Sequence, residues 1–166
     1  MNNYMKLEIA AKSVNEGFAR SAVAAFALSL NPSLSDLSDI KTAVSEAVTN
    51  AIVHAYAGQD GDDKILIECK TESEDGFGGV IHIKITDYGC GIENVEMALT
   101  PFYTTLADDE RSGMGFTIMQ TFSDGFSVTS EKGKGTTVEL TKRVGAEALC
   151  AEGMKAANRE KERLDA

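Results

Sequence analysis

Residues 81–91 read Ile-His-Ile-Lys-Ile-Thr-Asp-Tyr-Gly-Cys-Gly, the most informative stretch of the chain. Its three isoleucines alternate with polar residues, a pattern typical of a strand that buries one face. Asp87 ends this strand, and Gly89 and Gly91 come two and four residues later. Glycines let the backbone turn sharply and let a flat ligand approach closely. The stretch therefore predicts a strand that carries a carboxylate to a turn.

A carboxylate at the end of an apolar strand either starts a turn or binds a ligand. The 6-amino group of adenine would be a suitable donor to Asp87. An ordinary Asp-initiated turn without a ligand is the alternative, and the Asp87 motif alone leaves both open.

Upstream, a helix is predicted from residue 34 to about residue 57. Glu46 and Asn50 are four residues apart and so share one face of this helix. The amide oxygen of Asn50 is a hard ligand that suits magnesium. Glu46, one turn earlier, could accept a proton from an attacking hydroxyl or water. A solvated polar face is the alternative for this pair.

Downstream, Gly113 and Gly115 open a helix predicted from about residue 114 to residue 124, and its free N–H groups favour anions. Arg111 lies just ahead and could pair with phosphate oxygens. Thr136 follows Gly135 at the turn of a predicted hairpin. Each motif is weak alone, but the four in this order favour a magnesium nucleotide whose terminal phosphate is moved.

The other elements complete an α/β two-layer sandwich, with one mixed, mainly antiparallel sheet covered on one face by three helices. Strands are predicted near residues 5–9, 64–70, 80–86, 126–130 and 136–142, and a short helix at 95–99. A first helix starts with a capping box at Ser13, ends at Asn31-Pro32, and is predicted to pack through Val14, Phe18, Ala22, Phe26 and Leu30. Residues 1–143 form a single domain, and residues 144–166 a charged tail, helical or disordered.

Composition excludes several classes of function. The net charge of −10 argues against binding to a nucleic-acid backbone. No apolar run is long enough to span a membrane, and the N-terminus has no signal-peptide pattern. The three cysteines form no C-x-x-C motif, which argues against a thiol-ligated zinc site. We therefore expect a cytoplasmic protein with reduced thiols.

The stretches 46–56, 87–92 and 110–116 resemble the N, G1 and G2 boxes of the gyrase, chaperone and histidine-kinase ATPase superfamily. The chain is most similar to the small serine kinases of this superfamily that act as anti-sigma factors in spore-forming bacteria. The segments 20–26 and 40–46 carry this narrower resemblance, which covers residues 3–143 and not the tail.

The resemblance implies a Bergerat-type fold and a homodimer that binds ATP and Mg²⁺. It implies that the protein inhibits a sporulation sigma factor and phosphorylates a serine of an anti-anti-sigma protein. By matching position, Glu46 would be the general base, Asn50 the magnesium ligand and Asp87 the adenine contact. Arg20 would contact both protein partners. The nucleotide pocket and its lid would be formed by Gly89, Gly91, Thr105, Arg111, Gly113, Gly115 and Thr136.

The lid segment 104–110 has no basic residue before Arg111, and the 75–79 segment is glycine-rich; both depart from the family pattern. Three other functions stay open at this point. The chain could be the related general-stress anti-sigma kinase, or a nucleotide-dependent binding switch without kinase activity. It could also be the catalytic domain of a histidine kinase, although no phosphoacceptor helix precedes it.

Overall fold

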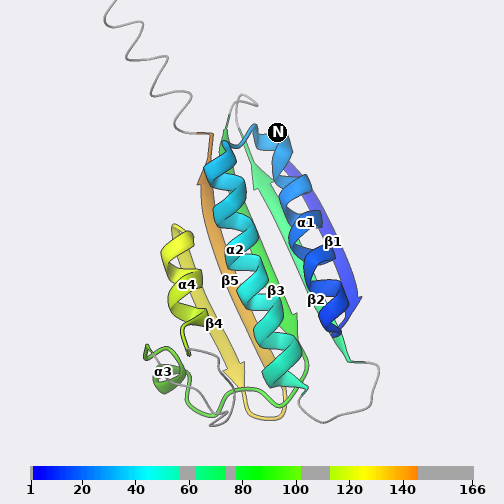
Figure 1. Cartoon of the computed structure of the whole chain (residues 1–166), viewed down its shortest axis with the longest axis vertical. Coiled ribbons are helices and arrows are strands. Elements are labelled where there is room, and N and C mark those ends of the chain that lie inside the picture. Colours follow the sequence, from blue (N-terminus) through cyan, green and yellow to red (C-terminus); the bar gives the residue numbers. More distant parts are fainter. Residues whose placement is uncertain (1, 57–62, 74–77, 102–112, 146–166) are drawn as a thin grey trace, which may run out of the picture.

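The computed structural model describes residues 2–56, 63–73, 78–101 and 113–145. These residues form one five-stranded sheet with helices on one face (Figure 1). The strands are β1 (Asn2–Ala10), β2 (Lys64–Glu72), β3 (Gly79–Asp87), β4 (Gly125–Glu131) and β5 (Gly135–Val144). The α-helices are α1 (Glu16–Ala27), α2 (Leu34–Asn50), α3 (Val95–Ala98) and α4 (Gly115–Phe122). Two 3-10 turns, η1 (Ser13–Asn15) and η2 (Leu28–Leu30), flank α1, and a π-helical turn, η3 (Ala51–Ala55), continues α2.

The sheet order is β1-β2-β3-β5-β4, and every pair is antiparallel. The two-layer sandwich is confirmed, but the expected parallel component of a mixed sheet is wrong for the described strands. The chain passes through two helices, α1 and α2, between β1 and β2. Strand β2 therefore runs opposite to β1 when the two strands pair. The crossover through α4 does return β4 in the direction of β3, but β5 inserts between them and pairs antiparallel with both.

The core lies between the sheet and the helices α1, α2 and α4 (Figure 1). The isoleucines of β3, Ile81, Ile83 and Ile85, are at most 3% exposed, which confirms the predicted alternation. Their neighbours His82 and Lys84 point to the opposite face of the sheet, as alternation along a strand requires.

The first helix differs from its prediction at the cap and at the first two predicted packing residues, whereas the predicted packing of Phe26 and Leu30 is confirmed. Helix α1 begins at Glu16 after a 3-10 turn, so Ser13 is not its cap. Val14 and Phe18 are 81% and 57% exposed. The buried face consists of Ala19, Val23, Ala24 and Ala27. The physical reason is that small side chains allow α1 to pack closely on α2, and this face lies one residue away from the larger apolar stripe.

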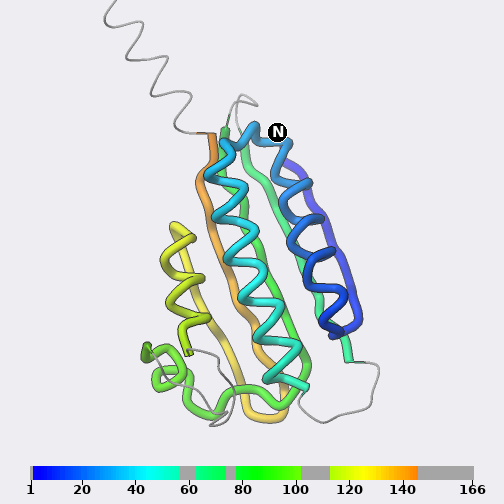
Figure 2. The backbone as a smooth tube through the Cα atoms, viewed as in Figure 1, coloured from blue at the N-terminus to red at the C-terminus, as the bar shows by residue number. Residues whose placement is uncertain are grey.

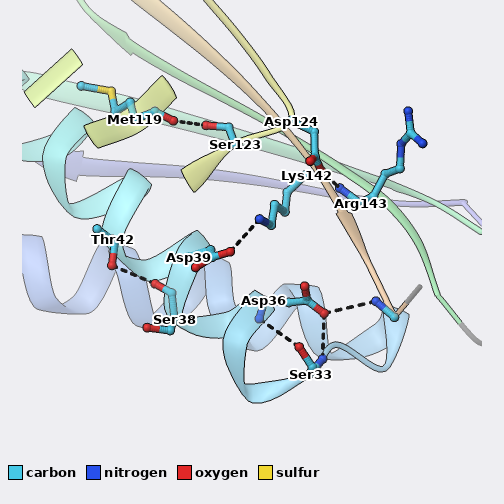
Figure 3. Close-up of polar contacts among 11 residues, drawn as sticks. Ser33, Asp36, Ser38, Asp39, Thr42, Met119, Ser123, Asp124, Lys142 and Arg143 are labelled. Atoms are coloured by element: carbon cyan, nitrogen blue, oxygen red, sulfur yellow. Dashed lines mark hydrogen bonds and ion pairs between the residues drawn. The ribbon is translucent and has the colours of Figure 1, made fainter. Parts of the chain in front are cut away.

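Helix α2 is anchored at its start by a capping box (Figure 3). The Ser33 hydroxyl accepts a hydrogen bond from the Asp36 N–H at 3.1 Å, and the Asp36 carboxylate accepts one from the Ser33 N–H at 2.9 Å. Asp36 also accepts from the Gly145 N–H at 3.2 Å, and Lys142 pairs with Asp39 at 2.7 Å. These contacts fix the start of α2 to the end of β5, so the direction of α2 across the sheet is set.

Two further features of the described residues concern membrane spans and cysteines. Within the described ranges, no helix combines the length and apolar character needed to cross a bilayer. Cys69 is buried and Cys90 is exposed, and both are free thiols.

Candidate functional site

Three segments meet at one end of the molecule: the end of α2 with η3, the chain after β3, and the β4–β5 turn (Figure 2). The Cys90 N–H donates to the Ala55 carbonyl at 2.9 Å, which joins the chain after β3 to η3. The Gly133 N–H donates to the Cys90 carbonyl at 2.7 Å, which joins the same chain to the hairpin turn. The G1-like and hairpin motifs, far apart in sequence, therefore share one corner.

Asp87 is the buried carboxylate of this corner, with 6% of its surface exposed. Its Oδ1 atom accepts hydrogen bonds from the N–H groups of Gly89 and Thr136, both at 3.1 Å. Burial raises the pKa of Asp87, and the two N–H donors offset part of that rise. Both bonds go to Oδ1, so the Oδ2 atom is the one that can accept from a ligand donor.

Close backbone contacts explain the glycines around Asp87. A Cβ atom on Gly89 would lie 2.2 Å from the Ala55 carbonyl oxygen, and one on Gly91 would lie 2.1 Å from that of Glu131. Gly91 also has a positive φ of 67°, which L side chains rarely adopt. A Cβ on Gly135 would lie 2.1 Å from the Asp87 carbonyl oxygen. These glycines thus allow the backbones of three segments to pack around the carboxylate.

Tyr56 holds the other side of the corner and was not predicted as a site residue. Its hydroxyl donates to the Lys64 carbonyl at 2.6 Å and accepts from the Tyr88 N–H at 2.8 Å. Burial raises the pKa of the Tyr56 phenol, so it stays protonated and able to donate at neutral pH. The sequence gives no signal for this role, because both partners are backbone groups distant along the chain.

Glu46 and Asn50 lie on α2 against the first residue of α4. A Cβ atom on Gly115 would lie 3.1 Å from both amide atoms of Asn50 and 3.2 Å from Oε2 of Glu46. The two side chains are half-buried, as expected for polar groups that line a site. The structure thus brings the N-box pair and the glycine of the G2-like motif together.

Helix α4 begins at Gly115, directly beside Glu46 and Asn50. Gly113 precedes it with a φ of 63°, and the helix itself packs on α2. Thr105 and Arg111 lie outside the described residues. A helix N-terminus beside an amide oxygen can hold an anion together with a cation.

The donors present fit a magnesium ion bound mainly by a nucleotide. Within the described part of the chain, no three or more His, Cys, Asp or Glu side chains gather as a metal site. The Asn50 amide oxygen is a hard donor of the kind that magnesium accepts. Magnesium here would therefore take most of its ligands from phosphate oxygens and water.

Arg20 lies on α1, exposed, and pairs with Glu16 at 3.4 Å. Glu16 in turn accepts a hydrogen bond from the Ser45 hydroxyl at 2.5 Å. Because Ser45 precedes Glu46, two polar contacts connect Arg20 to the part of α2 that carries Glu46. The four-residue spacing of Glu16 and Arg20 is typical of an intrahelical pair, whereas the link to α2 has no signature in the sequence.

A separate hollow of about 380 Å³ lies on the uncovered face of the sheet. Tyr4, His82 and Thr141 are among its lining residues, and none of the predicted site residues lines it. The hollow is therefore distinct from the corner around Asp87.

The model of the histidine kinase-like ATPase domain matches residues 9–142. Two solved structures have a similar fold. The RsbU and RsbW domains of a Mycobacterium tuberculosis protein match with a TM-score of 0.59 and 19% identity, over 86% of this chain and 32% of that one. The mycobacterial sensor histidine kinase MprB matches with a TM-score of 0.50 and 15% identity, over 86% of this chain and 98% of that one. The chain belongs to the histidine kinase-like ATPase family and is an ATP-binding domain of that type.

Curated relatives narrow the family further. The anti-sigma F factor of Clostridium botulinum (strain Eklund 17B / Type B) is 51% identical over 142 residues, which is 85% of this chain and 94% of that protein. Those of Caldanaerobacter subterraneus subsp. tengcongensis and Clostridium perfringens (strain SM101) are 50% and 51% identical, each over 87% of this chain and 96% and 99% of theirs. The chain therefore belongs with the anti-sigma F factors, and the resemblance inferred from its motifs is confirmed.

Proposed function

We propose that the protein holds a sporulation sigma factor, sigma factor F, inactive and phosphorylates a serine of an anti-anti-sigma protein. The relatives named anti-sigma F factor support the sigma partner. The position of Glu46 beside Asn50 and the start of α4 supports the kinase activity. Once phosphorylated, the anti-anti-sigma protein can no longer displace the sigma factor from this protein.

The proposed reaction transfers the terminal phosphoryl group of ATP to a serine hydroxyl. The bond between the serine oxygen and the γ-phosphorus forms, the bond to the β–γ bridging oxygen breaks, and ADP leaves. Glu46 accepts the hydroxyl proton, and Asn50 holds the magnesium ion through its amide oxygen. Magnesium, when bound, neutralises charge on the phosphates. The N-terminus of α4, with Gly113 and Gly115, faces the phosphate chain.

The adenine end of the nucleotide lies at the Asp87 corner in this proposal. The Oδ2 atom of Asp87 accepts from the 6-amino group, while Gly89, Gly91 and Thr136 form the surrounding wall. Thr105 and Arg111 are further proposed nucleotide contacts, with Arg111 near the terminal phosphate. One observation carries the proposal. The continuous helix formed by α2 and η3 carries Glu46 and Asn50 on its side, and its end contacts the Gly89–Cys90 turn.

Arg20 is the proposed contact for both protein partners. The sigma factor and the anti-anti-sigma protein therefore cannot bind at the same time. The exposure of Arg20 on α1 supports this role. The protein acts in the cytoplasm as a homodimer. Its single domain extends one residue beyond the predicted boundary at residue 143, because Val144 is the last residue of β5 and is 2% exposed.

Glu46→Gln tests the kinase activity most directly. The glutamine keeps the shape of the side chain but cannot act as a base, so phosphoryl transfer should fall by at least about 100-fold. Transfer is measured with labelled ATP and a purified anti-anti-sigma protein, and ADP affinity is measured in parallel. Glu139→Gln, on the opposite face of the sheet, is the matched control and should leave transfer unchanged.

The same assay separates the competing functions. Equal transfer by the Glu46→Gln variant removes the assignment of the base. No transfer by the unmodified protein, with ADP binding retained, indicates a binding switch without kinase activity. The sigma factor that co-purifies distinguishes a sporulation regulator from a general-stress regulator.

A further inference from the structure

The Ser130 hydroxyl makes three hydrogen bonds beside the Asp87 corner. It accepts from the Ile92 N–H at 2.7 Å, donates to the Gly135 carbonyl at 2.9 Å, and lies 2.9 Å from the Thr136 hydroxyl. Ser130 is the last residue but one of β4 and pairs in register with Thr136. We propose that Ser130 is a positioning residue that orients the adenine-binding corner and sets the preference for a 6-amino purine. This inference rests on the proposed nucleotide site.

A count of protons fixes the direction of these bonds. A hydroxyl has one proton, and the Gly135 carbonyl can only accept, so Ser130 gives its proton to that carbonyl. The Thr136 hydroxyl must then donate its own proton to Ser130. Both hydroxyl rotors are thereby held in one orientation, and the Ile92 N–H is satisfied by the same oxygen.

Ser130 fixes the two segments that enclose Asp87. On one side it holds Ile92, next to Gly91 at the end of the glycine turn. On the other side it holds Gly135, next to Thr136, whose N–H donates to Asp87 Oδ1 at 3.1 Å. Without the hydroxyl, both segments lose their common anchor, and the Ile92 N–H loses its acceptor. The Asp87 carboxylate is then held less firmly in the position from which it accepts a hydrogen bond from the ligand.

The effect should be confined to the base-binding end of the site. Glu46, Asn50 and Gly115 lie on α2 and α4, and Ser130 contacts neither helix through the hydrogen bonds described. Contacts to the diphosphate therefore persist when Ser130 is changed. Only a ligand that donates to Asp87 should lose affinity.

Two nucleotides separate this positioning effect from a general structural one. ADP carries a 6-amino donor, whereas inosine diphosphate carries a 6-oxo acceptor at the same place and gains nothing from the carboxylate. In the Ser130→Ala variant, ADP affinity should fall about 10-fold, while inosine diphosphate affinity should change less than about twofold. The ratio of the ADP affinity to the inosine diphosphate affinity should therefore decrease in this variant.

The experiment titrates the full-length protein with ADP and with inosine diphosphate, each with magnesium, by calorimetry. Ser130→Thr keeps the hydroxyl and should restore the preference to within about threefold of the unmodified protein. Ser127→Ala removes an exposed serine of the same strand, which contacts only Glu139 at 3.2 Å among the bonds described, and should change neither affinity. Circular dichroism and thermal melting check the fold of each variant.

Three outcomes decide the inference. A narrowed preference in Ser130→Ala with recovery in Ser130→Thr supports it. An unchanged ratio of the two affinities in Ser130→Ala, or an equal loss for both nucleotides, overturns it while the proposed function stands. If Ser130→Ala does not fold, Ser130→Thr decides: a folded protein with the unmodified preference supports the role, and one with a lost preference contradicts it. Failure of the unmodified protein to bind ADP overturns the proposed function as well.

Discussion

Gly115 lies directly against the side chain of Asn50, so that a Cβ atom on the glycine would be 3.1 Å from both amide atoms. Such a distance is shorter than nine in ten real Cβ contacts, so the Asn50 side chain would have to move slightly. The glycine therefore defines how closely the start of α4 approaches the proposed magnesium ligand. The contact also connects two motifs that are more than sixty residues apart in sequence.

We expect Gly115→Ala to weaken magnesium-dependent nucleotide binding. The added methyl group displaces the Asn50 amide by a few tenths of an ångström, which should lower ADP affinity about 10-fold with magnesium and less without it. Calorimetric titration with and without magnesium measures the difference. Gly17→Ala in α1 is the control: its nearest neighbour would be Arg20 at 3.9 Å, and ADP affinity should stay unchanged. Full magnesium-dependent affinity in Gly115→Ala contradicts the proposed place of Asn50.

The capping box of α2 should contribute stability that depends on pH. Burial alone would raise the pKa of Asp36, but hydrogen bonds from Ser33 and Gly145 outweigh it and lower the pKa below its ordinary value of 3.8. A lowered pKa gives stability that is present above that value and is lost as the pH falls through the pKa of the folded state. Asp36→Ala should therefore lower the free energy of unfolding by about 1–2 kcal/mol at neutral pH and by less in acid.

Urea denaturation of the Asp36→Ala variant at several pH values measures this contribution. Ser35→Ala, an exposed change in the same helical turn, should stay within about 0.5 kcal/mol of the unmodified protein. A deficit in Asp36→Ala that is the same at neutral and acid pH would show that the carboxylate charge plays no part.

Cys69 should make the protein less stable in alkaline solution. Burial raises the pKa of its thiol from 9.0 to about 12. Between these values the unfolded thiol ionises while the folded thiol stays neutral, so the unfolded state binds fewer protons and stability falls as the pH rises. From about pH 8.5 to about pH 10.5, this effect amounts to about 2 kcal/mol.

Cys69→Ala removes the thiol and its titration. The variant starts from a lower stability because of the cavity, but its free energy of unfolding should decline less steeply across the same pH range. Denaturation curves of both proteins at each pH give the two slopes. Parallel slopes would indicate that Cys69 ionises equally in the folded and unfolded states.

Local patterns were sufficient to predict most elements of the fold. The alternating isoleucines of β3 and the apolar stripe of α2 are periodic, and Asn31-Pro32 marks the end of the first helical segment. Asn31 adopts a left-handed φ of 51°, as a helix-terminating residue often does. Phe26 and Leu30 were predicted to pack and do so, but the alanines that α1 buries were missed, because packing through alanines depends on how close α2 lies and not on the largest side chains.

Residues of the candidate site could be proposed from the sequence where they carry a motif, and could not where they do not. Glu46 and Asn50 are four residues apart, which places them on one face of a helix, and Asp87 stands at the end of an alternating strand. Tyr56 and Ser130 contact backbone groups of distant segments, and such contacts have no sequence signature. For Ser130 the one available signal was its place opposite Thr136 in the predicted hairpin.

Titration of the protein and its Asp87→Asn variant with ADP tests the central claim most directly. The asparagine can still accept from the Gly89 and Thr136 N–H groups, so circular dichroism should be unchanged. Its amide nitrogen would face the 6-amino group of adenine with a donor, and ADP affinity should fall at least about 100-fold. Affinity equal to that of the unmodified protein would show that the buried carboxylate is not where the base binds.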